Sequence, residues 1–337
     1  MPDSAAFVEL ALKMLECSQK ELAVRVGVSP TQISKWKNGE HMSFEMEGKI
    51  RKLTGIGDLD PSVVEWAGSI SAAELWGKLF RRLAEVANDG SETGYKTYRF
   101  EESDYLDMLA WSTVHSLNKM GVAPPNVFPD DLQSALACFD DEEGDSEGQF
   151  EAAWAQIEKN RYTALISGIY KAFTDVCGFY AAYIEELVDD DDLGLLETSA
   201  ANIEPCLMDL AATKLAVDVA FAPKFHRFKH EVEKDYENWL TVVKDAAIKG
   251  GVPLRVELLD MIHKGGDELC EEAEAEALGF NDTRLHPDIY MNELLVGMRL
   301  IHQVLPAIMK KLEIYDDFKF DQSDLRNYKS NDDRDES

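Results

Sequence analysis

The chain has 337 residues, 45% of them hydrophobic, and its 64 acidic against 34 basic residues give a formal net charge of −30. This length predicts two domains, and this apolar content is ample for a buried core. No 18-residue apolar run and no basic segment ahead of an apolar one occur, which excludes a membrane span and a secretion signal. Five scattered cysteines without a C-x-x-C pair are typical of buried free thiols in a reducing compartment, so we expect a soluble, cytoplasmic protein.

The first predicted helix spans residues 5–16, whose apolar residues repeat at helical spacing. A second helix begins at Ser18, because Ser18 and Glu21 form an S-x-x-E capping box flanked by the hydrophobic staple of Cys17 and Leu22. Gly27 follows, where a tight turn between helices calls for a positive φ.

A third predicted helix begins eleven residues after the second, at Ser29. Ser29 and Gln32 form an S-x-x-Q capping box, and Pro30 takes the first helical position, where its missing N–H costs nothing. Gly39, preceded by Asn38, ends this helix. Two short helices joined by a turn of about three to four residues form a helix-turn-helix.

The second and third helices have one apolar and one polar face. The inward residues at helical spacing are Leu22, Ala23, Val26, Ile33 and Trp36. The outward face of the third helix carries side chains that can hydrogen-bond base edges and phosphates, namely Thr31, Gln32, Ser34, Lys35 and Lys37. Capped helical hairpins also occur in proteins that never meet DNA, but the paired caps, the turn glycine and the polar face together favour DNA recognition.

The motifs SQ-x-x-LA, VGVS, IS-x-W and NG resemble the phage-repressor and Cro-like (XRE-type) family of helix-turn-helix domains over about residues 5–56. The resemblance implies a lambda-repressor-like fold in which Gln19 and Asn38 hold phosphates. It also implies that the third helix reads the major groove through Thr31, Gln32 and Lys35. The complete predicted DNA-binding set is Gln19, Ser29, Thr31, Gln32, Ser34, Lys35, Lys37 and Asn38.

Three positions depart from the pattern of that family. Pro30 stands where relatives often place a base-reading side chain, so one base contact is expected to be missing. Gln32 has a competing use as the partner of Ser29 in a capping box. Lys37 stands where relatives often carry an acid, which favours contact with the phosphate backbone.

A helix from about 44 to 54, capped by Ser43, completes this predicted domain, and the stretch GIGDLDP at residues 55–61 has the composition of a linker. Residues 1–56 sum to +1, with eight basic and seven acidic side chains, whereas residues 57–337 sum to −31. Like-charge repulsion falls off over about 8–10 Å at physiological salt. DNA binding therefore requires the acidic body to point away from the duplex, or a second copy to add contacts.

The body is helical almost throughout by its pattern. Ser71 and Glu74 form a capping box that predicts a helix to about residue 88, and residues 94–101 alternate as in a short strand or an extended loop. An acidic loop is predicted at 140–148. Further helices are predicted at 103–120, 129–139, 149–187, 198–221, 224–249, 253–263 and 266–278.

The last predicted helix starts near Pro287, and its apolar residues form a heptad seam across about three repeats, with Pro306 predicted to kink it. This seam belongs either to an internal helix of a bundle or to a dimerisation helix. Residues 316–337 are polar and charged, which predicts a disordered tail. The seam comprises Met291, Leu294, Met298, Ile301, Leu305, Ile308 and Leu312.

Patterns that would support other chemistry are weak. The acidic runs near 140–145 and 189–192 are typical of solvated loops and helix ends rather than of aspartate-rich Mg²⁺ sites. His226 and His230 are spaced i, i+4, but the H-E-x-x-H motif is incomplete, and no G-x-S-x-G, P-loop or dinucleotide fingerprint occurs. We therefore expect no catalytic residues, no metal, no cofactor and no enzyme activity.

The sequence thus predicts an all-α protein with a helix-turn-helix DNA-binding domain at residues 1–56, a linker at 57–70, a large acidic helical dimerisation or regulatory domain at 71–315 and a disordered acidic tail at 316–337. The expected partners are double-stranded DNA and a second copy of the chain, since a single helix-turn-helix reads only one half-site. The predicted function is sequence-specific transcriptional regulation, most simply as a repressor.

Two alternatives to a plain regulator stay open. In the first, the acidic helical domain binds a basic protein partner, as an antitoxin or adaptor does, and DNA binding is autoregulatory. In the second, the helical domain senses a small molecule.

Overall fold

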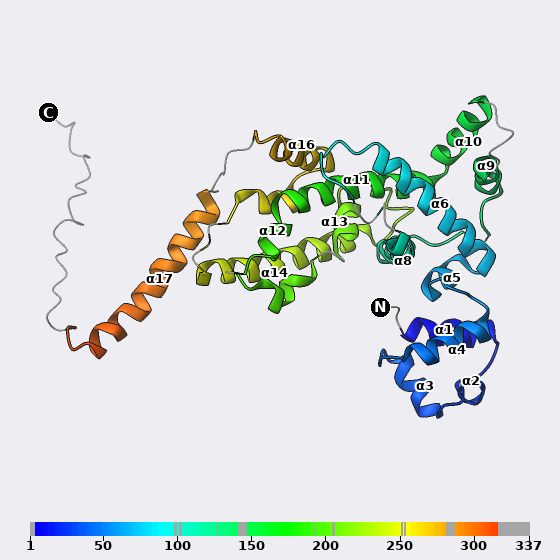
Figure 1. Cartoon of the computed structure of the whole chain (residues 1–337), viewed down its shortest axis with the longest axis horizontal. Coiled ribbons are helices and arrows are strands. Elements are labelled where there is room, and N and C mark those ends of the chain that lie inside the picture. The colour runs from blue at the N-terminus through cyan, green and yellow to red at the C-terminus, as the bar shows by residue number, and fades with distance from the viewer. Residues whose placement is uncertain are drawn as a thin grey trace, which may run out of the picture.

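The computed structural model describes residues 4–97, 100, 103–125, 127–140, 147–191, 193–203, 206–250, 252, 254–280 and 287–315. Within these ranges helices are the only regular secondary structure, so the predicted all-α class is confirmed. The amino-terminal helices are α1 (Ser4–Met14), α2 (Gln19–Val26), α3 (Pro30–Lys37), α4 (Phe44–Thr54), α5 (Pro61–Ala67) and α6 (Ile70–Asp89). Figure 1 shows them as a compact lobe, α1 to α4, joined through α5 to an elongated body.

The body begins with α6 and continues through helices of very different length. They are α8 (Ser103–Met120), α9 (Asp130–Asp140), α10 (Glu147–Lys159), α11 (Arg161–Tyr183), α12 (Glu185–Val188), α13 (Leu207–Thr213), α14 (Phe225–Gly250), α15 (Asp260–His263), α16 (Gly266–Ala277) and α17 (Pro287–Lys311), with short 3₁₀ helices η1 (Leu195–Glu197), η2 (Ser199–Asn202) and η4 (Val256–Leu259). No helix in the described ranges is both long and apolar enough to cross a membrane.

The amino-terminal lobe closes around side chains from all four of its helices. Phe7 of α1, Leu22 of α2, Ile33 of α3 and Ile50 of α4 are fully buried, and for Leu22 and Ile33 the helical spacing predicts this. The Oγ of Ser4 accepts a hydrogen bond from the Met42 N–H at 3.0 Å, which ties the loop after α3 to the start of α1. The lobe therefore has a core of its own, and α3 lies across α1 and α2.

Residues 61–67, inside the predicted linker at 57–70, form helix α5. Asp60 caps it by accepting from the Ser62 N–H at 2.8 Å, and burial raises the pKa of this carboxyl. Trp66 of α5 packs edge-on against Trp76 of α6, with ring centroids 5.1 Å apart. Arg51 of α4 donates to the carbonyl oxygens of Gly57 and Leu59 at 2.7 and 2.8 Å. The connection between lobe and body is thus packed and hydrogen-bonded on both sides.

Helix α11 is the centre of the body. It contacts α6, α10, α12, α13 and α16, and its buried side chains lie all around its axis. Tyr170, for example, is fully buried and shares a 2.6 Å hydrogen bond with Thr113 of α8. A helix with buried side chains all around its axis lies inside a bundle, which agrees with its position in Figure 1.

Several predicted helix boundaries in the body are wrong. Helix α6 is capped by Ser69, whose Oγ accepts from the Ala72 N–H at 3.1 Å, and not by the predicted Ser71 and Glu74 box. The helix begins earlier because α5 ends at Gly68 in a left-handed conformation, which puts Ser69 in the N-cap position of α6. The predicted run 149–187 breaks at Asn160, which caps α11 by accepting from the Tyr162 N–H at 3.0 Å.

The predicted helix at 198–221 is also wrong, since this segment forms η2, the short α13 and a turn-rich stretch. The predicted strand or loop at 94–101, the acidic loop at 140–148 and the tail at 316–337 lie partly or wholly outside the described residues. None of the five cysteines, all of which lie in the described ranges, is part of a disulfide; none is fully buried, contrary to the prediction, and Cys206 is exposed.

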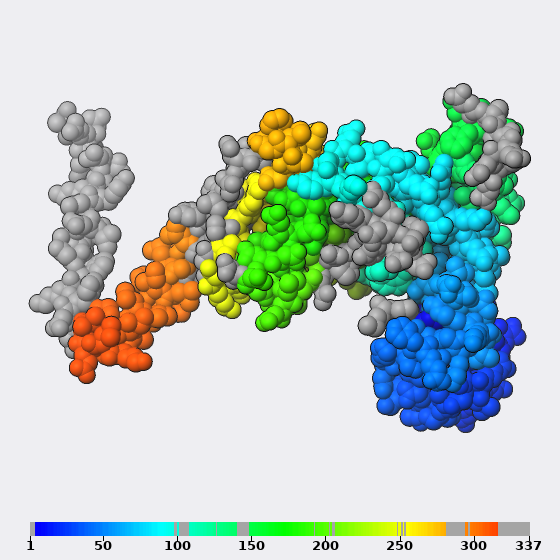
Figure 2. Space-filling model, viewed as in Figure 1, coloured from blue at the N-terminus to red at the C-terminus, as the bar shows by residue number. Residues whose placement is uncertain are grey.

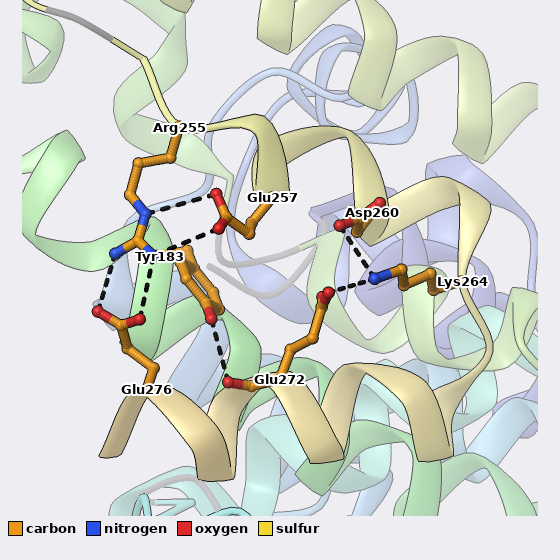
Figure 3. Close-up of polar contacts among 7 residues, drawn as sticks. All are labelled: Tyr183, Arg255, Glu257, Asp260, Lys264, Glu272 and Glu276. Carbon is orange, nitrogen blue, oxygen red and sulfur yellow. Dashed lines mark hydrogen bonds and ion pairs between the residues drawn. The ribbon is translucent and has the colours of Figure 1, made fainter. Parts of the chain in front are cut away.

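A network of charged side chains fixes the last packed elements of the body (Figure 3). The Arg255 guanidinium lies 4.6 Å from the centre of the Tyr183 ring and donates to the carboxylates of Glu276, at 2.8 Å, and Glu257, at 3.4 Å. Lys264 forms ion pairs with the carboxylates of Asp260 on α15 and Glu272 on α16. These contacts join α11, η4, α15 and α16, so the tightly packed part of the body extends to the end of α16.

Candidate nucleic-acid interface

Helix α2 begins with the full reciprocal capping box that the sequence predicts. The Ser18 Oγ accepts from the Glu21 N–H at 3.3 Å, and the Glu21 Oε2 accepts from the Ser18 N–H at 2.8 Å. The Ser18 hydroxyl also donates to the Glu21 Oε2 at 2.9 Å, and the hydrogen bonds that this carboxylate accepts from the Ser18 N–H and hydroxyl lower its pKa. The box fixes the first turn of α2, which carries Gln19.

The turn between α2 and α3 depends on a glycine and on one half of a capping box. Gly27 has φ +83°, a left-handed conformation that side chains with a Cβ rarely adopt. The Ser29 Oγ accepts from the Gln32 N–H at 3.2 Å, and Pro30 occupies the first turn. The return hydrogen bond from the Gln32 side chain to the Ser29 N–H is absent, so this capping box is only half formed and the Gln32 amide is available to a ligand.

Helix α3 ends in a Schellman motif. The Gly39 N–H donates to the Trp36 carbonyl at 3.0 Å and the Glu40 N–H donates to the Lys35 carbonyl at 3.0 Å, with Gly39 at φ +87°. This confirms the predicted helix end after Asn38. The tight reversal brings Glu40 back beside the last turn of α3.

The predicted contact residues of α3 fall into a central stripe and two flanks. Ile33 and Trp36 point into the lobe, and the opposite side, at i, i+3, i+4 and i+7, is exposed. Gln32, which is half-buried, and Lys37, which is exposed, lie on opposite flanks of the exposed stripe. The stripe consists of Thr31, Ser34, Lys35 and Asn38.

Both lysines of α3 are paired with glutamates that sequence reasoning did not select. The Lys35 Nζ lies 3.2 Å from the Glu40 carboxylate, and the Lys37 Nζ lies 3.9 Å from the carboxylate of Glu9 on α1. All four side chains are exposed. Glu40 follows Lys35 closely enough in sequence to have been noticed, whereas Glu9 is brought to Lys37 only by the crossing of α1 and α3.

The start of α2 supplies the second part of the candidate interface. Gln19 is half-buried there, and Lys20 beside it is exposed. Lys20 has no ion-pair partner in the described part of the chain, so it is a further candidate for phosphate contact that the family resemblance did not single out. The sequence feature that could have identified Lys20 is its position at the start of a helix, directly after the predicted phosphate contact Gln19.

The exposed face of α3 is accessible in the whole molecule. Figures 1 and 2 show the amino-terminal lobe at one end of the molecule, with α2 and α3 on the side of the lobe farthest from the body. Helices α1, α4 and α5 lie between α3 and the acidic body. The geometry thus meets the requirement that the body point away from a duplex lying on α3.

A second candidate site is a cavity of about 730 Å³ in the body, between α8, α13 and α14. Asp209 lies on its wall and is nearly buried; its carboxylate accepts from the Ser116 Oγ at 2.6 Å and the Lys119 Nζ at 2.7 Å. Phe228 and Trp239 supply apolar surface to the same cavity. A cavity that combines apolar walls with a few fixed polar groups is suited to a small molecule.

No group of three or more metal-ligating side chains lies together in the described ranges, and this includes the surroundings of His226 and His230. The acidic run near 140–145, predicted to be a solvated loop, falls largely outside those ranges.

Residues 8–47 match the sequence model of the helix-turn-helix family. The match covers α2, α3 and parts of α1 and α4, and it confirms the family resemblance that the motifs indicate for the amino-terminal residues. Comparison of the whole chain with curated proteins and with solved structures gave no significant match. The chain therefore carries a DNA-binding helix-turn-helix domain at its amino-terminal end.

Proposed function

We propose that this protein is a sequence-specific transcriptional regulator that binds double-stranded DNA through α3. The observation that carries the proposal is the exposed polar stripe of α3, which faces away from the acidic body and belongs to a domain that matches a DNA-binding family. In this docking the first turns of α3 enter the major groove.

Each side chain of the interface has a distinct part in the proposed complex. Lys35 and Thr31 on the central stripe contact base edges, and a good bidentate contact discriminates by about 1–3 kcal/mol against a wrong base. Gln19 and Asn38 at the helix ends, with Lys37 on the flank, hold phosphates and fix the register of the domain. Gln32 joins Lys35 and Thr31 at the base edges, since its side-chain amide is not used in the Ser29 cap.

A binding-site selection with randomised duplexes tests the proposal. The wild-type chain is expected to enrich a motif, and Lys35→Ala is expected to relax the preference at one or two positions while its thermal unfolding stays unchanged. Lys52→Ala, which removes an exposed lysine of α4, is the matched control and should leave the motif unaltered. Absence of any enriched motif for the wild-type chain would overturn the proposal.

The finer parts of the proposal are a dimer, repression and a cytoplasmic location. Two copies give two recognition helices and so match a two-fold operator. Occupation of a promoter by a large body behind α3 is the simplest route to repression. A reporter gene preceded by the selected motif distinguishes repression from activation, because the first lowers and the second raises its output.

The cavity beside Asp209 favours one additional function, regulation of DNA binding by a small molecule. Lys119 and Asp209 provide opposite charges for polar contacts with a ligand, and the apolar walls provide surface that a ligand can bury. A thermal-shift screen of metabolites against the wild-type chain and Trp239→Ala tests it. A ligand that stabilises only the wild-type chain supports the assignment, and a flat response across the panel argues against it.

A further inference from the structure

Helix α17 carries apolar side chains that the described part of the chain leaves exposed. The five described side chains of the heptad seam that lie between Leu294 and Ile308, and Leu312 just beyond the helix, are between 41% and 61% exposed. The corresponding apolar stripe of α6, from Trp76 to Leu83, is buried almost completely. The interpretation of the seam as part of an internal bundle helix is therefore wrong for the single chain.

The exposure follows from the position of α17. Among the described helices it makes more than isolated contacts only with α14, and Figures 1 and 2 show it projecting beyond the end of the body. An exposed apolar surface of this length is typical of an interaction site. An isolated helix also gains little stability in water without a partner that buries its apolar face.

The spacing of the exposed residues indicates that the partner is another helix. Met298, Ile301, Leu305 and Ile308 alternate steps of three and four, the pattern that packs knobs into holes along a supercoiled pair. Leu295 and Val304 are also exposed, and they widen the apolar face beyond a narrow seam. A second copy of this chain can supply such a helix, namely its own α17.

Charge favours a second copy over a basic partner. Residues 287–314, which comprise α17 and the three residues after it, carry three acidic and three basic side chains, so this segment is neutral at the end of a body that sums to −31 with it included. The seam presents no acidic surface to a basic protein. Two such neutral segments that project from their bodies can instead meet while the acidic bodies stay apart.

The order of these charges selects the direction of pairing. By sequence the acids Asp288 and Glu293 belong to the first half of α17, and the bases Lys310 and Lys311 to its last turn. Parallel helices would place the lysines of both copies side by side. An antiparallel pair places the lysines of one copy along the acids of the other, and it also aligns the helix dipoles favourably.

We propose that α17 pairs in antiparallel orientation with α17 of a second copy through the Leu294–Leu312 seam. This deepens the proposed function, on whose dimer it rests, by assigning the dimer contact to one helix. Because α17 and the amino-terminal lobe lie at opposite ends of the molecule, the pair holds its two recognition helices at its outer ends (Figure 1). Such a dimer suits half-sites separated by several turns of DNA rather than adjacent ones.

The first test measures mass in solution, without DNA, by light scattering coupled to size exclusion. The full chain is expected to be a dimer at micromolar concentration. Ile301→Glu is expected to raise the dissociation constant about 100-fold or more, because two carboxylates would be buried without partners. Val86→Glu, at an apolar position of α6 that is 46% exposed against 57% for Ile301, is the matched control and should remain a dimer.

The second test addresses orientation. Reversing both lysines, as Lys310→Glu with Lys311→Glu, should weaken the dimer at least about tenfold, and adding Asp288→Lys with Glu293→Lys should restore it. Parallel pairing predicts no loss from the first change, since like charges face each other before and after it. Circular dichroism verifies that each variant keeps its helices.

A monomeric wild-type chain, or an Ile301→Glu variant that dimerises like the wild type, overturns the inference. Either result leaves the DNA-binding proposal untouched, because the helix-turn-helix of a monomer still enriches a half-site in the selection experiment. Conversely, a chain that dimerises through α17 but enriches no DNA motif retains this inference and removes the proposed function.

Discussion

Lys35 and Glu40 are joined twice at the end of the recognition helix. The Glu40 N–H donates to the Lys35 carbonyl at 3.0 Å, and the Lys35 ammonium lies 3.2 Å from the Glu40 carboxylate. The backbone bond is part of the motif that ends α3, so Glu40 stands beside Lys35 whether or not DNA is present. A side chain proposed to contact DNA is therefore partly neutralised by a fixed neighbour.

The first prediction follows from that pair. Glu40→Gln should raise the affinity for duplex DNA about three- to tenfold at 0.1 M salt. The substitution removes a negative charge that would repel the DNA phosphates, and it releases Lys35 from its ion pair so that Lys35 can bind DNA. The gain should shrink as salt is added. Titration of labelled duplex by anisotropy measures it, with Glu85→Gln on α6 as a charge-matched control distant from α3; equal effects of the two variants would contradict the prediction.

The second prediction concerns the connection between the lobe and the body. Arg51→Ala should lower the free energy of unfolding by about 1.5–3 kcal/mol, because the hydrogen bonds from its guanidinium to the carbonyls of Gly57 and Leu59 are lost. The contact of the guanidinium carbon with the Phe7 ring, whose centre lies 4.9 Å from it, is lost as well. Limited proteolysis should cut residues 55–60 faster. Lys52→Ala, the exposed neighbour, should show neither effect in thermal unfolding or digestion.

The third prediction concerns the close packing around α11. A Cβ on Gly178 would lie 2.5 Å from the Cβ of Thr93, a fully buried side chain, so Gly178→Ala should lower stability by about 1–3 kcal/mol. Gly77 of α6 meets no atom within 4 Å, and Gly77→Ala should instead raise stability by up to about 1 kcal/mol. Chemical denaturation of both variants should give opposite signs; two losses would contradict this packing.

The fourth prediction is a pH dependence that originates at Asp175 of α11. Burial raises the pKa of this carboxyl to about 6, Lys171 lowers it, and Asp267, Cys270 and Glu92 face it from neighbouring segments. The folded carboxyl keeps a proton that the unfolded chain releases near its ordinary pKa of 3.8. The favourable contribution of Asp175 to the free energy of unfolding is thus complete below about pH 4 and is lost as the pH rises through about 6.

Asp175→Asn should therefore raise the melting temperature, and the gain should be larger at pH 8 than at pH 5. Asp58→Asn removes one negative charge from an exposed position and serves as the control. A gain that is the same at both pH values, or larger at pH 5, would show that ionisation of Asp175 is not its cause.

The helix-turn-helix could be derived almost completely from the sequence. The Ser18 capping box, the turn at Gly27 and the end of α3 at Gly39 all formed where the residues predict them. These features depend on hydrogen bonds and φ angles within a few residues of each other, so local sequence is sufficient to specify them. The family match covers this same segment.

The tertiary structure decided what depends on partners distant in sequence. Helix α5 forms in a stretch with linker composition because Trp66 packs against Trp76, and Glu9 reaches Lys37 only because α1 crosses α3. The heptad seam of α17 is compatible with a buried or an exposed helix, since periodicity gives the direction of a face but not what covers it. Only the placement of α17 beyond the body showed that the other described residues leave that face uncovered.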